Sequence, residues 1–180
     1  GYGAGEDLTD AVGVTLVGYA AGGNVTTAAG ATAIGYEAGG TLVDGGYNML
    51  AGYQAGRALS TGDSNTAIGY QALKTEDTGD KSTAIGAYSL YTQNNDAENG
   101  NTAVGYRSGY TIGTGTWNTI MGAYAGDALT TGGSNVLIGS SAGGAATVLG
   151  SCVFIGSNAG DAISTSTGSN GTVGIGANAL

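Results

Sequence analysis

A glycine returns every seventeen residues along almost the whole chain. Eight of the ten intervals are 17 residues long, and the other two are 19 and 20. The marked positions are Gly1, Gly18, Gly35, Gly52, Gly69, Gly86, Gly105, Gly122, Gly139, Gly156 and Gly176. A fixed period with matching neighbours is typical of repeat proteins, in which each repeat packs only on the next one.

The repeat unit favours strands and turns. Its clearest copies read NTAIGYQAL (65–73), STAIGAYSL (82–90) and NTAVGYRSG (101–109). A helical reading fails because each glycine in a helix costs about 1 kcal/mol relative to alanine. We therefore predict an all-β protein, a parallel β-solenoid or β-roll of about ten coils with two short strands per coil. Coils should stack about 4.8 Å apart. Residues 1–180 then form a single repeat domain, which we expect to be a fragment of a longer fibre because the array begins and ends within a repeat.

Two columns of large aliphatic residues predict the core. One precedes the glycine, and the other follows it by seven residues. We expect both to be buried, because large aliphatic side chains are usually inside. The first column holds Val17, Ile34, Ile68, Ile85, Val104, Met121, Ile138, Ile155 and Ile175, and the second holds Leu8, Leu42, Leu59, Ile112, Leu129 and Ile163.

A third apolar column lies two residues before the glycine and predicts an interface between chains. Alternation along a strand directs it away from the first column, so both faces of the strand are apolar. Strands of this kind are normally covered on both sides. Self-association would cover the second face, and the alternative is a thicker single-chain solenoid. The column is Leu16, Ala33, Leu50, Ala67, Ala84, Ala103, Ile120, Leu137 and Phe154.

Two polar or aromatic columns predict ladders of stacked side chains. The residue after the glycine is Tyr2, Tyr19, Tyr36, Tyr53, Tyr70 or Tyr106 in six coils. We favour ring stacking that stiffens the rod over a sugar-binding surface. The residue four before the glycine is Asn48, Asn65, Asn101, Asn118 or Asn135 in five coils. These side chains should form an amide ladder rather than an ion site.

For a threonine column and a charged cluster we predict structural roles rather than binding sites. Thr15, Thr32, Thr66, Thr83, Thr102 and Thr119 lie two residues before the first aliphatic column. They should point inward with that column, which disfavours an ice-binding face. The cluster around Glu76 interrupts the second aliphatic column, and mixed charges of this kind usually form a solvated surface.

The composition excludes several classes of function. The chain has no histidine, one cysteine and a net charge of −9. It therefore lacks a Ser-His-Asp triad, a His-based zinc site and a disulfide framework. An acidic chain with four basic residues is a poor ligand for nucleic acid. No apolar run approaches the length of a transmembrane helix. We expect no enzymatic activity, no metal and no cofactor.

The NTAIGYQAL and NTAVGYRSG stretches resemble repeats in two kinds of fibre. One is the head of trimeric autotransporter adhesins, and the other is the bacteriophage tail fibre. The resemblance covers nearly the whole chain and implies a left-handed, homotrimeric β-roll, extracellular on a virion or a bacterial surface. Its function would be structural or adhesive: a rod that spaces or presents an attachment tip for a cell-surface glycan or receptor. The period of 17 and the tyrosine column favour the phage-fibre side. The alternative is a ligand-binding solenoid for ice or glycan.

Overall fold

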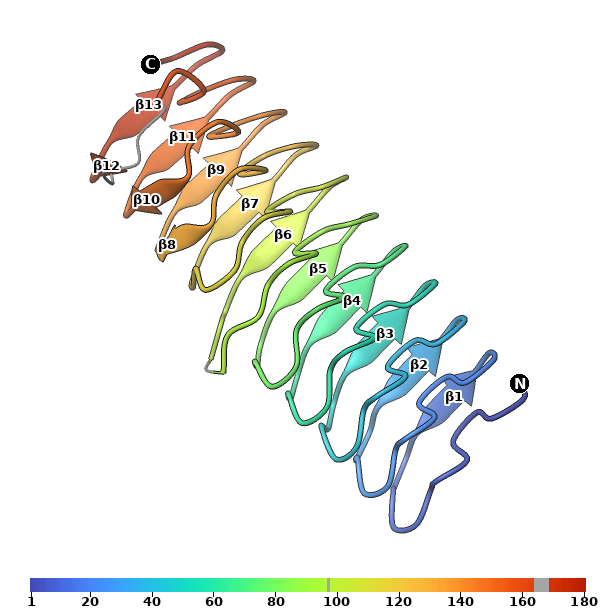
Figure 1. Ribbon diagram of the computed structural model, residues 1–180. Helices are drawn as coiled ribbons and strands as arrows, with labels where there is room; N and C mark the ends of the chain where they lie inside the picture. Colours follow the sequence, from blue (N-terminus) through green and yellow to red (C-terminus); the bar gives the residue numbers. More distant parts are fainter. Residues whose placement is uncertain (97, 164–168) are drawn as a thin grey trace.

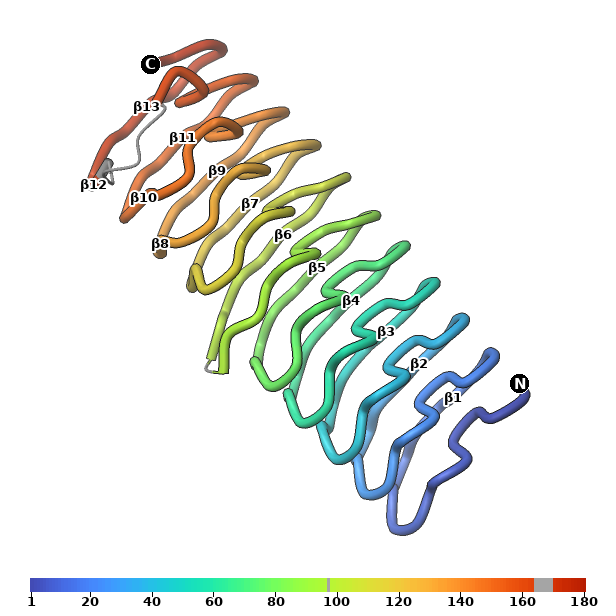
Figure 2. The backbone as a smooth tube through the Cα atoms, in the orientation of Figure 1, coloured from blue at the N-terminus to red at the C-terminus, as the bar shows by residue number. Residues whose placement is uncertain are grey.

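The chain forms a straight stack of similar coils with its two termini at opposite ends (Figures 1 and 2). The computed structural model describes residues 1–96, 98–163 and 169–180. Within these ranges the secondary structure consists of strands, turns and bends, without a helix. No membrane-spanning helix occurs in the same ranges. The predicted all-β, parallel solenoid with coils of about 17 residues is confirmed.

One ten-stranded parallel sheet runs the length of the stack. Its order is β1-β2-β3-β4-β5-β6-β7-β9-β11-β13, so each coil contributes one strand and pairs with the coils before and after it. Pairing is in register: Ala67 lies opposite Ala84, and Ile68 opposite Ile85. The strands are β1 (Thr15–Val17), β2 (Thr32–Ile34), β3 (Met49–Ala51), β4 (Thr66–Ile68), β5 (Thr83–Ile85), β6 (Thr102–Val104), β7 (Thr119–Met121), β9 (Val136–Ile138), β11 (Val153–Ile155) and β13 (Val173–Ile175).

A second, three-stranded parallel sheet occurs only in the last coils. It has the order β12-β10-β8, with β8 at Thr131–Gly133, β10 at Val148–Gly150 and β12 at Ser169–Asn170. In the earlier coils the corresponding wall consists of turns and isolated bridges such as Val12 with Ala29. The prediction of two strands in every coil is therefore correct only near the C-terminal end.

The inside and the outside of the main sheet are the reverse of the prediction. The middle residue of each strand points into the coil, so the column predicted as an interface between chains lines the core. Leu16 is partly buried, and the other eight are fully buried: Ala33, Leu50, Ala67, Ala84, Ala103, Ile120, Leu137 and Phe154.

The aliphatic column before the glycine faces outward, so its prediction as core is wrong. Exposure is at least 37% for Val17, Ile34, Ile68, Ile85, Met121 and Ile175, while Val104, Ile138 and Ile155 are half-buried. On the opposite wall, Leu42, Leu59, Ile112 and Leu129 are fully buried, as predicted. Leu8 in the first coil is 43% exposed, and Ile163 is partly buried against the core.

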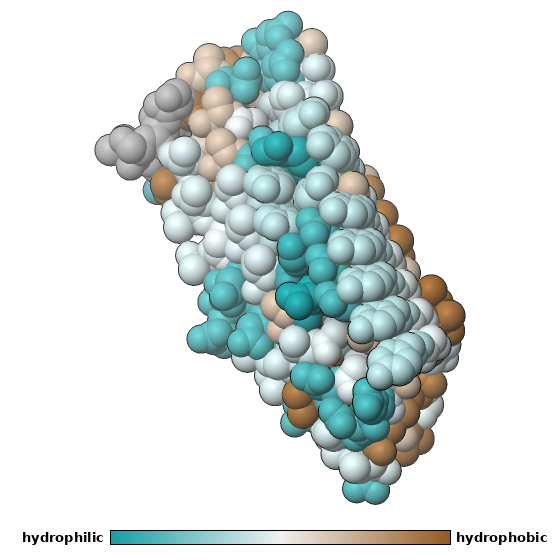
Figure 3. Space-filling view, turned by 45° about the vertical axis from the view of Figure 1, so that its right-hand side comes forward, coloured by the Kyte–Doolittle hydropathy of each residue, from teal (hydrophilic) through white to brown (hydrophobic). Residues whose placement is uncertain are grey.

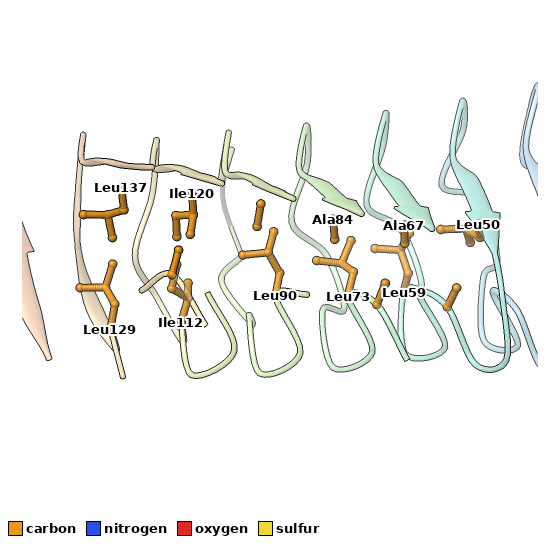
Figure 4. Packing of buried hydrophobic residues seen from close by; sticks show 14 of the residues in the cluster. Leu50, Leu59, Ala67, Leu73, Ala84, Leu90, Ile112, Ile120, Leu129 and Leu137 are labelled. Carbon is orange, nitrogen blue, oxygen red and sulfur yellow. The ribbon is translucent and has the colours of Figure 1, made fainter. Parts of the chain in front are cut away.

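The narrow core explains the reversal. Side chains from the strand and from the opposite wall meet end to end in a single layer, as Ala84 and Leu73 do (Figure 4). An alanine on the strand therefore suffices wherever the opposite wall supplies a leucine. The assumption that the bulkier column must be buried does not hold for such a thin coil.

The recurring glycine is required by close contact between coils. Gly52 has φ +136°, and a Cβ atom there would lie 2.4 Å from the carbonyl oxygen of Gly69. Both the backbone conformation and the space exclude a side chain at this position. The chain can therefore stack its coils at strand spacing only with glycine at this corner.

The asparagine column forms the predicted amide ladder inside the coil. Asn65 donates its backbone N–H to Oδ1 of Asn48 at 2.8 Å, and Nδ2 of Asn65 donates to the carbonyl of Gly79 at 2.8 Å. The same pattern joins Asn101 and Asn118 at 2.9 Å. All five side chains of the column are at most 1% exposed. Each amide thus satisfies backbone groups of two coils that would otherwise be buried without a partner.

Candidate functional site

The outward surface of the main sheet carries an unbroken strip of uncharged side chains. We define the Thr/Ile face as the first and third residues of the ten strands, Thr66 and Ile68 in β4, for example. Ile34 is 44% exposed and Ile68 is 39% exposed. No position of this face holds a charged residue. A continuous apolar strip of this length is unusual on a monomeric protein, and large exposed apolar patches are typical of interaction surfaces.

The threonine column belongs to this outward face. Side chains at positions i and i+2 of a strand lie on the same side of the sheet. Thr66 and Thr83 therefore face outward together with the exposed Ile68 and Ile85. The prediction that threonine points inward is therefore wrong. Of its six members, Thr15 is exposed and the other five are half-buried.

Two large aromatic side chains extend the Thr/Ile face on the side where each strand begins. Tyr47 is 72% exposed and Trp117 is 53% exposed. Both adopt left-handed backbone conformations, with φ of 56° and 58°. The Trp117 ring covers Gly100 in the preceding coil, whose missing side chain leaves room for it. Neither residue belongs to a column that the sequence analysis singled out.

The tyrosine column forms the predicted stack along the other side of the Thr/Ile face. Tyr19, Tyr36 and Tyr53 have ring centroids 5.1 Å apart with interplanar angles of 9°. The stack continues to Tyr2 at 5.8 Å and to Tyr70 at 5.2 Å. Figure 3 shows a row of side chains along the rod beside a hydrophobic band. The prediction of ring stacking is confirmed for these five tyrosines, whose ring faces cover one another.

The stack ends at Tyr70, where a different aromatic cluster begins. Tyr88 lies one residue later in its coil and meets Tyr70 at 70° and Tyr106 at 83°. Tyr106 therefore does not continue the parallel stack. Partial desolvation, and then the neighbouring Tyr70, raises the pKa of the Tyr88 phenol. The sequence analysis missed Tyr88 because the residue had moved out of the column.

Arg107 is held at the centre of this cluster. Its guanidinium lies 4.2 Å from the ring centroid of Tyr110 and 5.8 Å from that of Tyr124. Two hydrogen bonds of 3.2 Å join it to Asp127, and these bonds raise the pKa of Arg107. The arginine is thereby fixed as a cation whose charge is largely neutralised by its neighbour.

A polar strip lies beside the stacked tyrosines in the earlier coils. Glu37 accepts hydrogen bonds from Nε2 of Gln54 at 2.8 Å and Nε of Arg57 at 2.7 Å. The Gln54 bond first, and then the Arg57 bond, lowers the pKa of the Glu37 carboxyl. The charge of Glu37 in turn raises the pKa of the Tyr36 phenol. Gln71 continues the row by donating to Oε1 of Gln54 at 2.8 Å.

Glu76 is buried inside the coil, contrary to the predicted solvated surface. Its side chain is fully buried and accepts hydrogen bonds from the backbone N–H of Asp77 at 3.1 Å and of Gly79 at 2.9 Å. Nε2 of Gln93 and Nδ2 of Asn99 donate to its other oxygen at 3.0 and 2.8 Å. Donors from two coils thus replace the leucine contacts that this column makes elsewhere.

Three shallow hollows lie in a line on the face that carries Tyr88, Asp127 and Asn158. Their volumes are about 310, 290 and 240 Å³. Within 1–96, 98–163 and 169–180, no group of three or more carboxylate, thiol or imidazole side chains is placed to hold a metal ion. The Cys152 side chain is buried.

Comparison with protein-family models, with curated proteins and with solved structures gave no match to the chain. The class that the structure itself defines is a parallel β-solenoid with coils of about 17 residues.

Proposed function

We propose that the chain is a self-associating rod, a segment of a structural or adhesive fibre in which identical chains pack through the Thr/Ile face. The observation that carries the proposal is the outward apolar column of this face, uncharged over all ten strands. Burial of exposed isoleucine and valine stabilises an assembly by about 25 cal/mol per Å² removed from water.

A second copy of the chain is the partner that fits this surface best. Side chains on the face repeat at strand spacing, and another copy carries the same repeat, so ridges of one rod can fit the grooves of the other along their full length. Ten strands of three residues cover a flat area of about 400 Å² per chain. Two such faces bury about 800 Å² in total, below the roughly 1,200 Å² of stable specific interfaces, so residues that flank the face must also take part. The flanking Tyr47 and Trp117 add aromatic contacts of the kind enriched at interfaces.

The resemblance to adhesin heads and phage tail fibres supports the rest of the proposal. It favours a homotrimer with the Thr/Ile faces directed towards the common axis. It also favours a position outside the cell, on a virion or a bacterial surface, where the rod spaces or presents an attachment tip. A rod stabilised by stacked ladders supports such a mechanical role and requires neither a cofactor nor catalytic chemistry.

Oligomeric state tests this proposal directly. Sedimentation equilibrium of the chain should give a trimer, and the double variant Ile68→Glu/Ile85→Glu should be a folded monomer. Ala145→Glu/Ala162→Glu is the matched control, because it adds the same two charges at exposed positions on a different side of the coil. A monomeric parent chain, or a trimer in both variants, would contradict the assembly through the Thr/Ile face.

Ice binding is the second candidate because the threonine column is outward. Regular ranks of threonine beside β-branched residues can order water on a flat sheet. The threonine rank is interrupted by Met49, Val136, Val153 and Val173, which favours self-association instead. Thermal hysteresis that is present in the chain and abolished by Thr66→Tyr/Thr83→Tyr would support ice binding over assembly.

A further inference from the structure

We propose that the line of hollows near the C-terminal end is a binding groove for a neutral, linear oligosaccharide. We call it the C-terminal groove. Asn158 and Asp161 line both of the larger hollows, which makes these two continuous. The hydrogen-bonded pair of Arg107 and Asp127 lies between the third hollow, which Arg107 lines, and the largest hollow, which Asp127 lines. The groove lies on a different side of the coil from the Thr/Ile face, so it does not depend on self-association.

The largest of the three hollows exists because two columns of the repeat hold small residues in one coil. In the coil that begins at Gly52 these columns hold Gln54 and Arg57, whose side chains cover the surface. Five coils later the same columns hold Ser141 and Gly144. The surface therefore recedes between Asp127 on one side and Asp161 on the other. The small residues Ser141 and Gly144 lie in one coil, and the adjoining hollow between Asn158, Asp161 and Asn178 extends the depression along the rod.

Tyr124 supplies an aromatic platform at one end of the largest hollow. Its ring meets Tyr106 edge to face at 79° and lines the hollow on the side of Ser141. Because the next residue in its column is a serine, no ring stacks on that side of Tyr124. The rings of Tyr36 and Tyr53, in contrast, are covered on both faces by their neighbours. A sugar ring can therefore stack on Tyr124 but not within the parallel stack.

The polar groups of the groove match hydroxyl groups. Asp161 supplies carboxylate acceptors, and Nδ2 of Asn158 donates to Oδ1 of Asn178 at 3.2 Å, which leaves the Asn158 carbonyl as an acceptor and the Asn178 amide as a donor. The basic group at the groove, Arg107, is already paired with Asp127. An anionic sugar would meet the Asp161 carboxylate on a chain of charge −9, whereas a neutral sugar avoids that repulsion.

The shape of the groove favours a straight ligand. It runs from the coil of Tyr88 to the coil of Asn178, about 24 Å at the spacing of parallel strands. β-1,4-linked pyranose chains are extended and straight, so several consecutive rings can follow the rod axis. Binding sites of this kind combine an apolar surface with a few placed polar groups.

Titration of the full chain with defined hexasaccharides tests the groove. Cellohexaose or chitohexaose should bind with a Kd of about 1 mM or below by calorimetry. Backbone amide shifts should change in residues 141–145 and 158–162 and stay constant in β3–β5. Absence of saturable binding of both neutral sugars would overturn the proposal, as would tighter binding of a heparin hexasaccharide or shifts confined to the stacked tyrosines.

Three single variants separate the groove from the stack. Tyr124→Ala and Asn158→Ala should each weaken binding by roughly three- to tenfold. Tyr36→Ala is the matched control, since it removes a tyrosine of equal exposure from the parallel stack and should leave affinity unchanged. Loss of affinity in Tyr36→Ala alone would overturn the proposal. The shift mapping on the parent chain decides the case if a variant fails to fold.

Discussion

Leu50 and Gly56 pack against each other across the core: a Cβ atom on Gly56 would lie 2.7 Å from Cδ2 of Leu50. One coil later the same two positions hold Ala67 and Leu73, and both are fully buried. The large side chain has moved from the strand to the opposite wall. The core is therefore filled by a pair of positions rather than by one column, and this pairing yields the first prediction.

Leu50→Ala should destabilise the protein by about 2–5 kcal/mol, because it leaves a cavity that the rigid coil cannot close. The double variant Leu50→Ala/Gly56→Leu recreates the pair found in the next coil and should recover about half of that loss. The left-handed backbone at Gly56, φ 55°, is the conformation that Leu73 adopts at φ 51°. Chemical denaturation of the single and double variants measures the coupling. Additive losses in the double variant would show that the two positions do not compensate.

Gly69→Ala should prevent folding or destabilise the solenoid by more than about 3 kcal/mol. The added Cβ atom would lie 2.6 Å from backbone atoms of Gly86, and φ is +138°. Gly113→Ala is the matched control, because its nearest contact would be 3.7 Å and its backbone lies outside the left-handed region. The control should stay within about 1 kcal/mol of the parent chain. Equal melting temperatures for the two variants would contradict the close approach of coils at Gly69.

Glu76→Gln should destabilise the chain by about 2–4 kcal/mol. The amide nitrogen of glutamine is itself a donor, and it would face N–H groups that now donate hydrogen bonds to the carboxylate. The affected donors are the backbone N–H groups of Asp77 and Gly79 and the side chains of Gln93 and Asn99. Urea unfolding measures the change in the free energy of unfolding.

Glu98→Gln is the control for Glu76→Gln. Glu98 is 52% exposed and pairs with Lys81, so its replacement should change stability by no more than about 1 kcal/mol. A loss at Glu76 no larger than the loss at Glu98 would refute a structural role for the buried carboxylate.

Gln54→Ala and Arg57→Ala should each raise the pKa of Glu37, because each removes a hydrogen bond to the ionised carboxyl. A pKa lowered in the folded state contributes stability above the unfolded pKa. This contribution is lost as the pH falls through the folded value. Carbon-detected NMR titration of Glu37 in the parent chain and in the two variants measures the change in pKa. An unchanged pKa in both variants would contradict the role of these two hydrogen bonds.

The sequence identified the coil and its ladders because the period equals one turn of the solenoid. Each residue then lies over its counterpart in the next coil, so columns such as Asn48–Asn65 and Tyr36–Tyr53 can be identified from the sequence alone. A residue that lies one position outside its column cannot be recognised from the period alone. Tyr88 and Tyr124 moved by one residue and formed a cluster with Arg107, which only their positions in space reveal.

The sequence by itself determined that the chain forms stacked parallel coils of about seventeen residues, because local spacing sets which residues lie above one another. The tertiary structure alone decided which side of each strand is inside. Both Ala67 and Ile68 are apolar, so alternation permitted either choice. The choice depends on the volume that Leu73 supplies from the opposite wall, and on the narrow space between the walls. That arrangement places alanine in the core and leaves isoleucine in contact with solvent.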